Sequence, residues 1–153
     1  MPIIGIDFSL ANVTFDDRKM VHSVKEENQN KYRDILMSIS KSFRQISPSS
    51  LLYGFGAKTI KKKGETSHLF VASGDLLNPI VQTDNIENTY YECLKRIEIG
   101  FPTYLAGVLK KAVEFAENAD IHYKEREEEG AVLSYFVVYI LAAGIVDDLA
   151  DCI

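Results

Sequence analysis

The sequence predicts an α/β fold, a doubly wound and mainly parallel sheet with helices on both faces. Three segments, 3–8, 51–56 and 135–141, have the nearly continuous apolar character of strands buried in a parallel sheet. Segments between them carry apolar residues at three- and four-residue spacings, as amphipathic helices do. Strands that alternate with helices favour a parallel sheet that is covered on both faces.

The composition indicates one ordinary globular domain over residues 1–153. Hydrophobic residues make up 46% of the 153-residue chain and charged residues 25%, and the net charge is −5. This negative charge argues against nucleic acid as a partner. The longest apolar run, residues 135–146, is too short for direct membrane insertion. Two cysteines form no metal or disulfide framework and no signal peptide is visible, so we expect a cytoplasmic protein.

The first half of the chain predicts a strand, a helix and two further strands. After the strand at 3–8, apolar residues at helical spacing predict a helix over 31–46, which Ser47 and Pro48 terminate. The second strand, 51–56, contains two glycines that allow a close approach or a turn. A short strand at 68–71 is expected at an edge of the sheet.

The second half predicts two helices and a last strand. The helices are expected over 86–97 and 103–117, with Thr103 as the N-cap of the second. The last strand begins at Tyr135 and ends at Leu141, and the strand order of a doubly wound sheet places it beside the first strand.

Polar groups at the strand ends predict a candidate cation site. Asp7 and Ser9 alternate at the end of the first strand, so both side chains can point to the ligand side of the sheet. Thr103 arrives from the loop before a helix. One carboxylate with two hydroxyls suits magnesium or calcium, which take oxygen ligands.

An enzyme is not expected. His22, His68 and His122 lie in different segments, without a carboxylate or nucleophile at a catalytic spacing, and each is interpreted as a packing or surface residue. The glycines at 54 and 56 lack the further glycine and the lysine of a phosphate-binding loop.

The order and spacing of several motifs resemble the von Willebrand factor A (vWA) domains, specifically the copine-type A domain, over essentially the whole chain. The residues that carry the resemblance are Ile6-Asp7-Phe8-Ser9 with Asn12, Tyr53-Gly54-Phe55-Gly56-Ala57, Ser67-His68 before Phe70, Pro102-Thr103, Tyr135-Phe136-Val137, Ile140-Leu141, Gly144 and Asp148.

The resemblance implies a metal-ion-dependent adhesion site that is degenerate here. That site uses Asp-x-Ser/Thr-x-Ser, a distant threonine and an aspartate in a Thr-Asp-Gly turn, of which Asp7, Ser9 and Thr103 are matched. Ala11 stands in place of the second serine, and Ala142-Ala143 replaces the Thr-Asp pair. With one carboxylate lost, we expect no metal or other cofactor, although Mg²⁺ or Ca²⁺ binding is the alternative.

The resemblance also implies further strand–helix units after the last strand, so the domain is interpreted as shortened at its C-terminus. The strand from Tyr135 to Leu141 would then be an exposed apolar edge, which needs a covering protein partner in a longer polypeptide or in a homo- or hetero-oligomer. Copines are associated with calcium-dependent phospholipid binding, but the resemblance assigns that activity to C2 domains outside this sequence.

These observations leave three functional hypotheses. The first is a non-enzymatic protein–protein interaction or structural module, and the second is a ligand-binding A domain that depends on Mg²⁺ or Ca²⁺. The third is a scaffold subunit of a large assembly, such as a cytoskeletal array.

Overall fold

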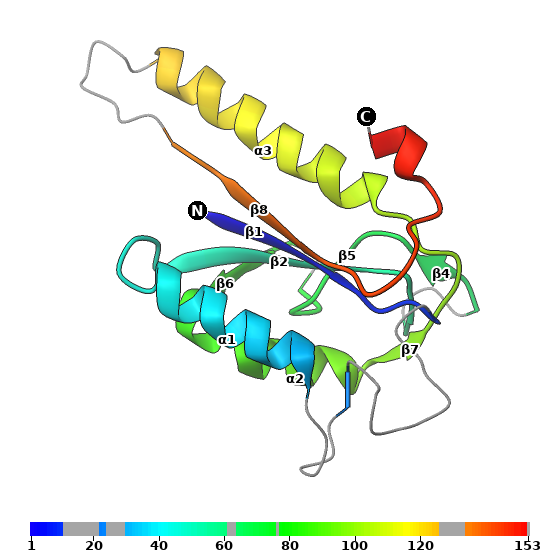
Figure 1. Cartoon of the computed structure of the whole chain (residues 1–153). Helices are drawn as coiled ribbons and strands as arrows, with labels where there is room; N and C mark the ends of the chain where they lie inside the picture. Colours follow the sequence, from blue (N-terminus) through cyan, green and yellow to red (C-terminus); the bar gives the residue numbers. More distant parts are fainter. Residues whose placement is uncertain (11–21, 24–29, 61–63, 76, 126–133, 153) are drawn as a thin grey trace.

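The main sheet is mixed but mainly parallel, which confirms the predicted α/β fold class. The computed structural model describes residues 1–10, 22–23, 30–60, 64–75, 77–125 and 134–152. The sheet has the order β5-β2-β1-β8, with β6 also pairing β2 (Figure 1). Its parallel strands are β1 (Pro2–Asp7), β2 (Ser49–Phe55) and β8 (Val137–Leu141), and the short antiparallel strands are β5 (Phe70–Val71) and β6 (Ile80–Gln82).

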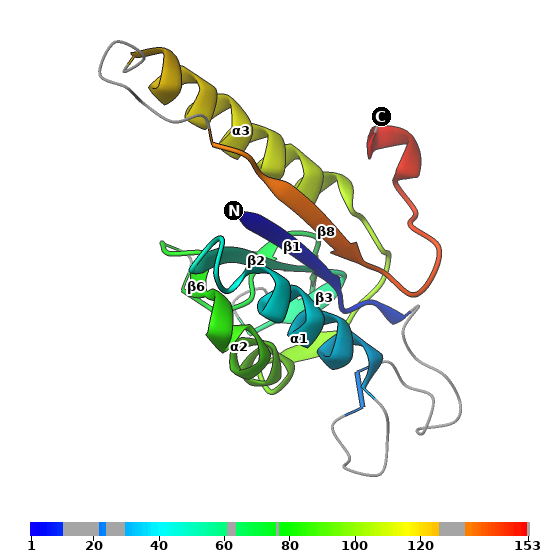
Figure 2. The same cartoon turned by 60° about the vertical axis from the view of Figure 1, so that its left-hand side comes forward.

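Helices cover both faces of this sheet, as predicted. Helices α1 (Lys31–Phe43) and α2 (Ile86–Leu94) lie on one face, and α3 (Ala106–Glu125) runs along the other (Figure 2). The first face buries Ile4 and Ile6 of β1 against α1 and α2, and the second buries Ile3 against Val108 of α3. Both faces of β1 are therefore buried, which explains its continuous apolar sequence. Two 3₁₀ helices, η3 (Thr83–Asn85) and η5 (Leu149–Cys152), complete the regular elements named here.

A small second sheet was not predicted. Its order is β4-β3-β7, formed by Thr66–Ser67, Ala57–Thr59 and Ile97–Ile99. The helix expected over 86–97 ends at Leu94, and Ile97 begins β7 instead. The Ile97-Glu98-Ile99 segment alternates in the manner of a strand and pairs antiparallel with β3, so tertiary pairing determines its conformation.

The predicted start of the last helix is also wrong. Helix α3 begins at Ala106, so Thr103 is not its N-cap. Its first backbone N–H groups find a distant acceptor: the N–H groups of Leu105 and Ala106 donate to the carboxylate of Asp148, at 2.7 and 2.9 Å. A carboxylate at the positive end of a helix is favourable, and here it comes from the segment after β8.

The two glycines of the second strand region have the roles that the sequence indicated. A Cβ atom on Gly54 would lie 2.3 Å from Cζ of Phe70, so the phenyl ring packs directly against the β2 backbone. Gly56 has a φ of +74°, which favours glycine, as the chain turns from β2 into β3. The Gly54 contact brings β5 against β2, and the turn at Gly56 leads the chain from β2 into the small sheet.

Candidate functional site

The predicted site residues lie at the carboxyl end of β1. Asp7 and Ser9 are fully buried and Thr103 is nearly so. Oδ1 of Asp7 accepts a hydrogen bond from the N–H of Ser9 at 2.8 Å. Ser9 forms a parallel bridge with Gly100, so the 100–103 loop that carries Thr103 runs beside it. The backbone thus brings the three predicted residues to one end of the sheet, whereas Ala11 lies outside the described residues.

Two aspartates that were not among the predicted site residues, Asp147 and Asp148, approach the same loop. The N–H of Thr103 donates to Oδ2 of Asp147 at 2.7 Å, and the N–H of Asp147 donates to the carbonyl of Thr103 at 2.8 Å. Asp148 caps the start of α3 by accepting the N–H groups of Leu105 and Ala106, which follow Thr103 in the chain. The adjacent acidic pair soon after a strand end was the available signal, but its targets lie more than forty residues earlier.

The chemistry of these donors fits a divalent cation poorly. Magnesium needs near-octahedral oxygen ligands and sheds water reluctantly, so it depends on ligand charge. The carboxylates of Asp147 and Asp148 already accept backbone N–H groups, and the side chain of Ala143 offers no ligand. Within the described ranges, no cluster of three or more His, Cys, Asp or Glu residues is arranged to hold a metal. That the site holds no metal stays a prediction.

His22 joins the end of β1 to both helices of the first face, as a packing residue. Its Nε2 lies 2.8 Å from the carbonyl oxygen of Asp7, and its Nδ1 lies 2.8 Å from the hydroxyl of Tyr90. Burial lowers the pKa of His22 to about 4, partly offset by the bond to Asp7, so the ring is neutral at pH 7. A carbonyl only accepts, so Nε2 carries the proton and Nδ1 accepts from Tyr90.

Asn30 extends this network to the start of α1. Its amide nitrogen donates to the Tyr90 hydroxyl at 3.2 Å, and its oxygen accepts the N–H of Arg33 at 2.9 Å as the N-cap of α1. The ring of Phe8 stacks on His22 with centroids 5.0 Å apart. The polar residues near Asp7 therefore hold helices in place, which is a structural role.

The outer side of β8 is a candidate interaction surface. β8 pairs with β1, and the N–H of Val137 donates toward β1, to the Met1 carbonyl, at 3.2 Å. Since successive N–H groups of a strand point to opposite sides, those of Val138 and Ile140 point away from β1. Val137 and Val138 are 41% and 39% exposed, and no described strand pairs with this side. We call this outward backbone, with the side chains of Val137 and Val138, the β8 edge.

Comparison with known protein families shows which family the chain belongs to. The family model described as copine matches residues 20–153. The chain belongs to the copine family. It is 22% identical over 154 residues to Copine-A of Dictyostelium discoideum, an alignment that includes 99% of this chain and 24% of that protein. This copine chain therefore spans about a quarter of the length of the curated relative it matches.

An open hollow flanks the β8 edge on the α1 face of this copine fold. It has a volume of about 370 Å³ and is lined by Tyr139 of β8 and by one side of α1, including Ile35, Ser38 and Ile39. Tyr139 packs edge-on against Phe43 with centroids 5.9 Å apart, which fixes the wall of the hollow. Half-buried apolar surface beside an unpaired strand edge gives a partner side-chain contacts in addition to backbone bonds.

Among the described helices, none is long and apolar enough to cross a membrane.

Proposed function

We propose that this copine-family chain is a non-enzymatic protein–protein interaction module in which a strand of a partner protein pairs with the β8 edge. The observation that carries the proposal is that β8 is hydrogen-bonded on one side only, among the described residues. Its five residues contain neither charge nor proline, the features with which sheet edges usually block pairing. The outward N–H groups of Val138 and Ile140 are therefore available to an added strand.

Strand addition combines two sources of affinity. Backbone hydrogen bonds along the edge provide the first, and side-chain pockets on either side of the strand provide affinity and specificity. The exposed Val138 offers apolar area on one face of β8, and the hollow between α1 and Tyr139 offers it on the other. A partner strand with apolar side chains on both faces would bury these surfaces from water.

The chemistry of potentially reactive side chains supports a non-catalytic role. Both ring nitrogens of His22 are engaged in structural hydrogen bonds. Burial raises the pKa of the Cys93 thiol to about 12, which keeps it from acting as a thiolate nucleophile at neutral pH.

The test uses the purified chain with no other protein, because an open edge can also pair with a second copy. Light scattering during size-exclusion chromatography measures the mass, and fluorescence of a hydrophobic dye measures accessible apolar surface. We expect concentration-dependent association and strong dye binding, both reduced by Val138→Lys. The matched control is Val113→Lys, since Val113 is an exposed valine on α3 and does not belong to β8. A monodisperse monomer with little dye binding would contradict the proposal.

A further inference from the structure

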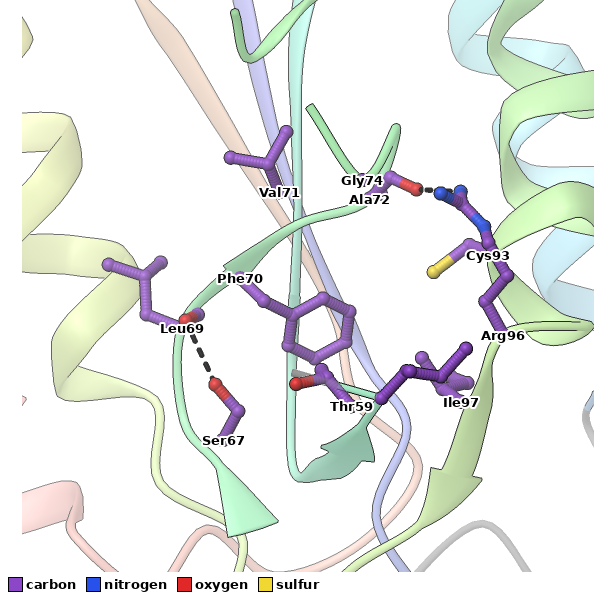
Figure 3. A pocket seen from close by; sticks show the side chains of 11 residues that line it. Thr59, Ser67, Leu69, Phe70, Val71, Ala72, Gly74, Cys93, Arg96 and Ile97 are labelled. Carbon is purple, nitrogen blue, oxygen red and sulfur yellow. Dashed lines mark hydrogen bonds between the residues drawn. The ribbon is translucent and has the colours of Figure 1, made fainter. Parts of the chain in front are cut away.

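A cavity of about 320 Å³ lies between the β5 side of the main sheet and the small sheet (Figure 3). Phe70 projects into the space between its walls, with Thr59 of β3 and Ile97 of β7 on one side and Cys93 of α2 on another. Because the Cys93 thiol is buried and neutral, it contributes an uncharged surface. The cavity is remote from the β8 edge, since β5 and β8 lie at opposite ends of the strand order.

One charged side chain lines this apolar cavity and is held in place. The Nε of Arg96 donates to the carbonyl of Glu92 at 2.9 Å, and its two terminal nitrogens donate to the carbonyls of Ser73 and Ala72, each at 2.8 Å. These bonds use three of the five N–H donors of a guanidinium group, so each terminal nitrogen keeps one more. Gly74 packs directly against the guanidinium group, since a Cβ atom at this position would lie 1.9 Å from Nη1 of Arg96.

Arg96 forms no ion pair with a carboxylate among the described residues, although the nearby Glu92 carboxylate interacts with its charge. A second hollow of about 350 Å³ shares Arg96 with the first and adds Lys58, Lys95 and Glu98. Lys95 forms an ion pair with Glu92 at 2.6 Å, and Lys58 lies opposite Glu98 in the β3–β7 register. Within the described residues Arg96 donates hydrogen bonds to backbone carbonyls only, so no carboxylate is bonded directly to its guanidinium group.

We propose that this cavity binds a small apolar carboxylate. The apolar part would contact Phe70 and Ile97, and the carboxylate would accept the remaining N–H donors of Arg96, a charge-assisted interaction that is stronger than a neutral hydrogen bond. The Thr59 hydroxyl makes no hydrogen bond within the described part of the chain and provides a further donor. Small-ligand sites typically begin near the volume of this cavity and are mostly apolar with few polar groups.

The probe is 3-phenylpropionate, titrated into the ¹⁵N-labelled full chain and followed by amide chemical shifts. A ligand of this size is expected to bind in the millimolar range or more tightly, with shift changes at Phe70, Ala72 and Arg96. Acetate, which has the charge without the ring, and 3-phenylpropan-1-ol, which has the ring without the charge, should each bind at least tenfold more weakly. Equal shift changes with either control compound would overturn the proposal, as would no change with the acid.

Two variants test the assignment in different ways. Arg96→Gln should weaken 3-phenylpropionate binding at least tenfold and leave binding of the alcohol unchanged. Arg96 also holds the backbone of residues 72–73, so a second variant is needed that leaves Arg96 in place. Thr59→Phe fills the cavity from a half-exposed strand position and should abolish binding. The control, Val113→Phe on α3, should not. Unchanged binding by a folded Thr59→Phe variant would contradict the cavity as the site. If a capped Asp-Phe dipeptide bound more tightly than 3-phenylpropionate, the ligand would be a peptide segment, which would contradict the proposed small carboxylate. Val138→Lys should leave this binding unaltered, so the cavity and the β8 edge are tested separately.

Discussion

At one edge of the main sheet, strands β5 and β6 pair with the backbone of β2. At the other edge, β8 has no described neighbour besides β1. Phe70 of β5 packs against β2 in the space left by Gly54, and its ring lies 5.9 Å from that of Phe8. On the β8 side, two valines are more than a third exposed. One sheet thus has one edge that is closed by the chain's own residues and one at which no described strand pairs.

The difference between the two edges indicates which residues we expect to stabilise the fold and which we expect to bind a partner. The close Gly54 contact lies on the covered side and the His22 network lies at the carboxyl end of β1, so changes at either place should reduce the free energy of unfolding. Changes on the β8 edge remove little internal packing and should mainly alter association. The following expected effects run from the largest to the smallest.

The largest effect is a loss of stability in acid caused by His22. The folded state holds a neutral ring with a pKa of about 4, whereas the unfolded chain titrates near 6.5. The unfolded state therefore binds more protons between these values, and the stability present above pH 6.5 falls as the pH drops toward 4, by on the order of 3 kcal/mol. Urea denaturation at several pH values should show a smaller fall in His22→Gln. The same fall in both proteins would contradict a buried neutral ring.

The second effect is overpacking at the covered edge. Gly54→Ala places a Cβ atom against the buried rings of Phe70 and Phe8, which should cost about 2 kcal/mol of unfolding free energy. Chemical denaturation measures this cost. Adding Phe70→Leu should recover part of it, because the shorter side chain makes room. Additive costs in the double variant would show that the two residues do not touch.

The third effect is a loss of capping on the α3 side. Asp148→Ala removes the acceptor for the N–H groups of Leu105 and Ala106 and should cost about 1 kcal/mol. Asp151→Ala is the matched control, because Asp151 is an exposed aspartate in the short helix η5 that follows Asp148. Equal stability of the two variants in thermal denaturation would mean that Asp148 does not hold the start of α3.

The smallest effect concerns the Asp7 end of β1. Isothermal titration with Mg²⁺, Mn²⁺ and Ca²⁺ should give no measurable binding, because few charged oxygens remain for a cation. Micromolar binding that Ser9→Ala abolishes would instead establish a working metal site.

The sequence predicted the elements whose burial pattern is strong. The continuous apolar runs located β1, β2 and β8, and the stripe that includes Tyr32, Leu36 and Ile39 located α1, although the helix ends at Phe43 instead of residue 46. Parallel pairing of β8 with β1 followed from the expected strand order and is confirmed. These features depend on local periodicity and on general rules of topology, both of which are visible in one sequence.

The features that the sequence did not predict depend on partners distant in the chain. Ile97 continued a helical spacing, yet pairing with β3 makes it part of a strand. Thr103 has the residue type of an N-cap, but the acceptor at the start of α3 is Asp148. For the same reason the contribution of Asp147 to the Thr103 loop was not predicted, because no local pattern reports which backbone N–H group a carboxylate will reach.

The most direct test of the account is amide hydrogen exchange of β8 as a function of protein concentration. The N–H groups of Val138 and Ile140 point away from β1, so a strand added at the edge would protect them. We predict that their exchange slows as the chain associates, and that Val138→Lys removes this concentration dependence at Ile140. Exchange at Val138 and Ile140 that stays equally fast while the wild-type chain associates would contradict the β8 edge as the interaction surface.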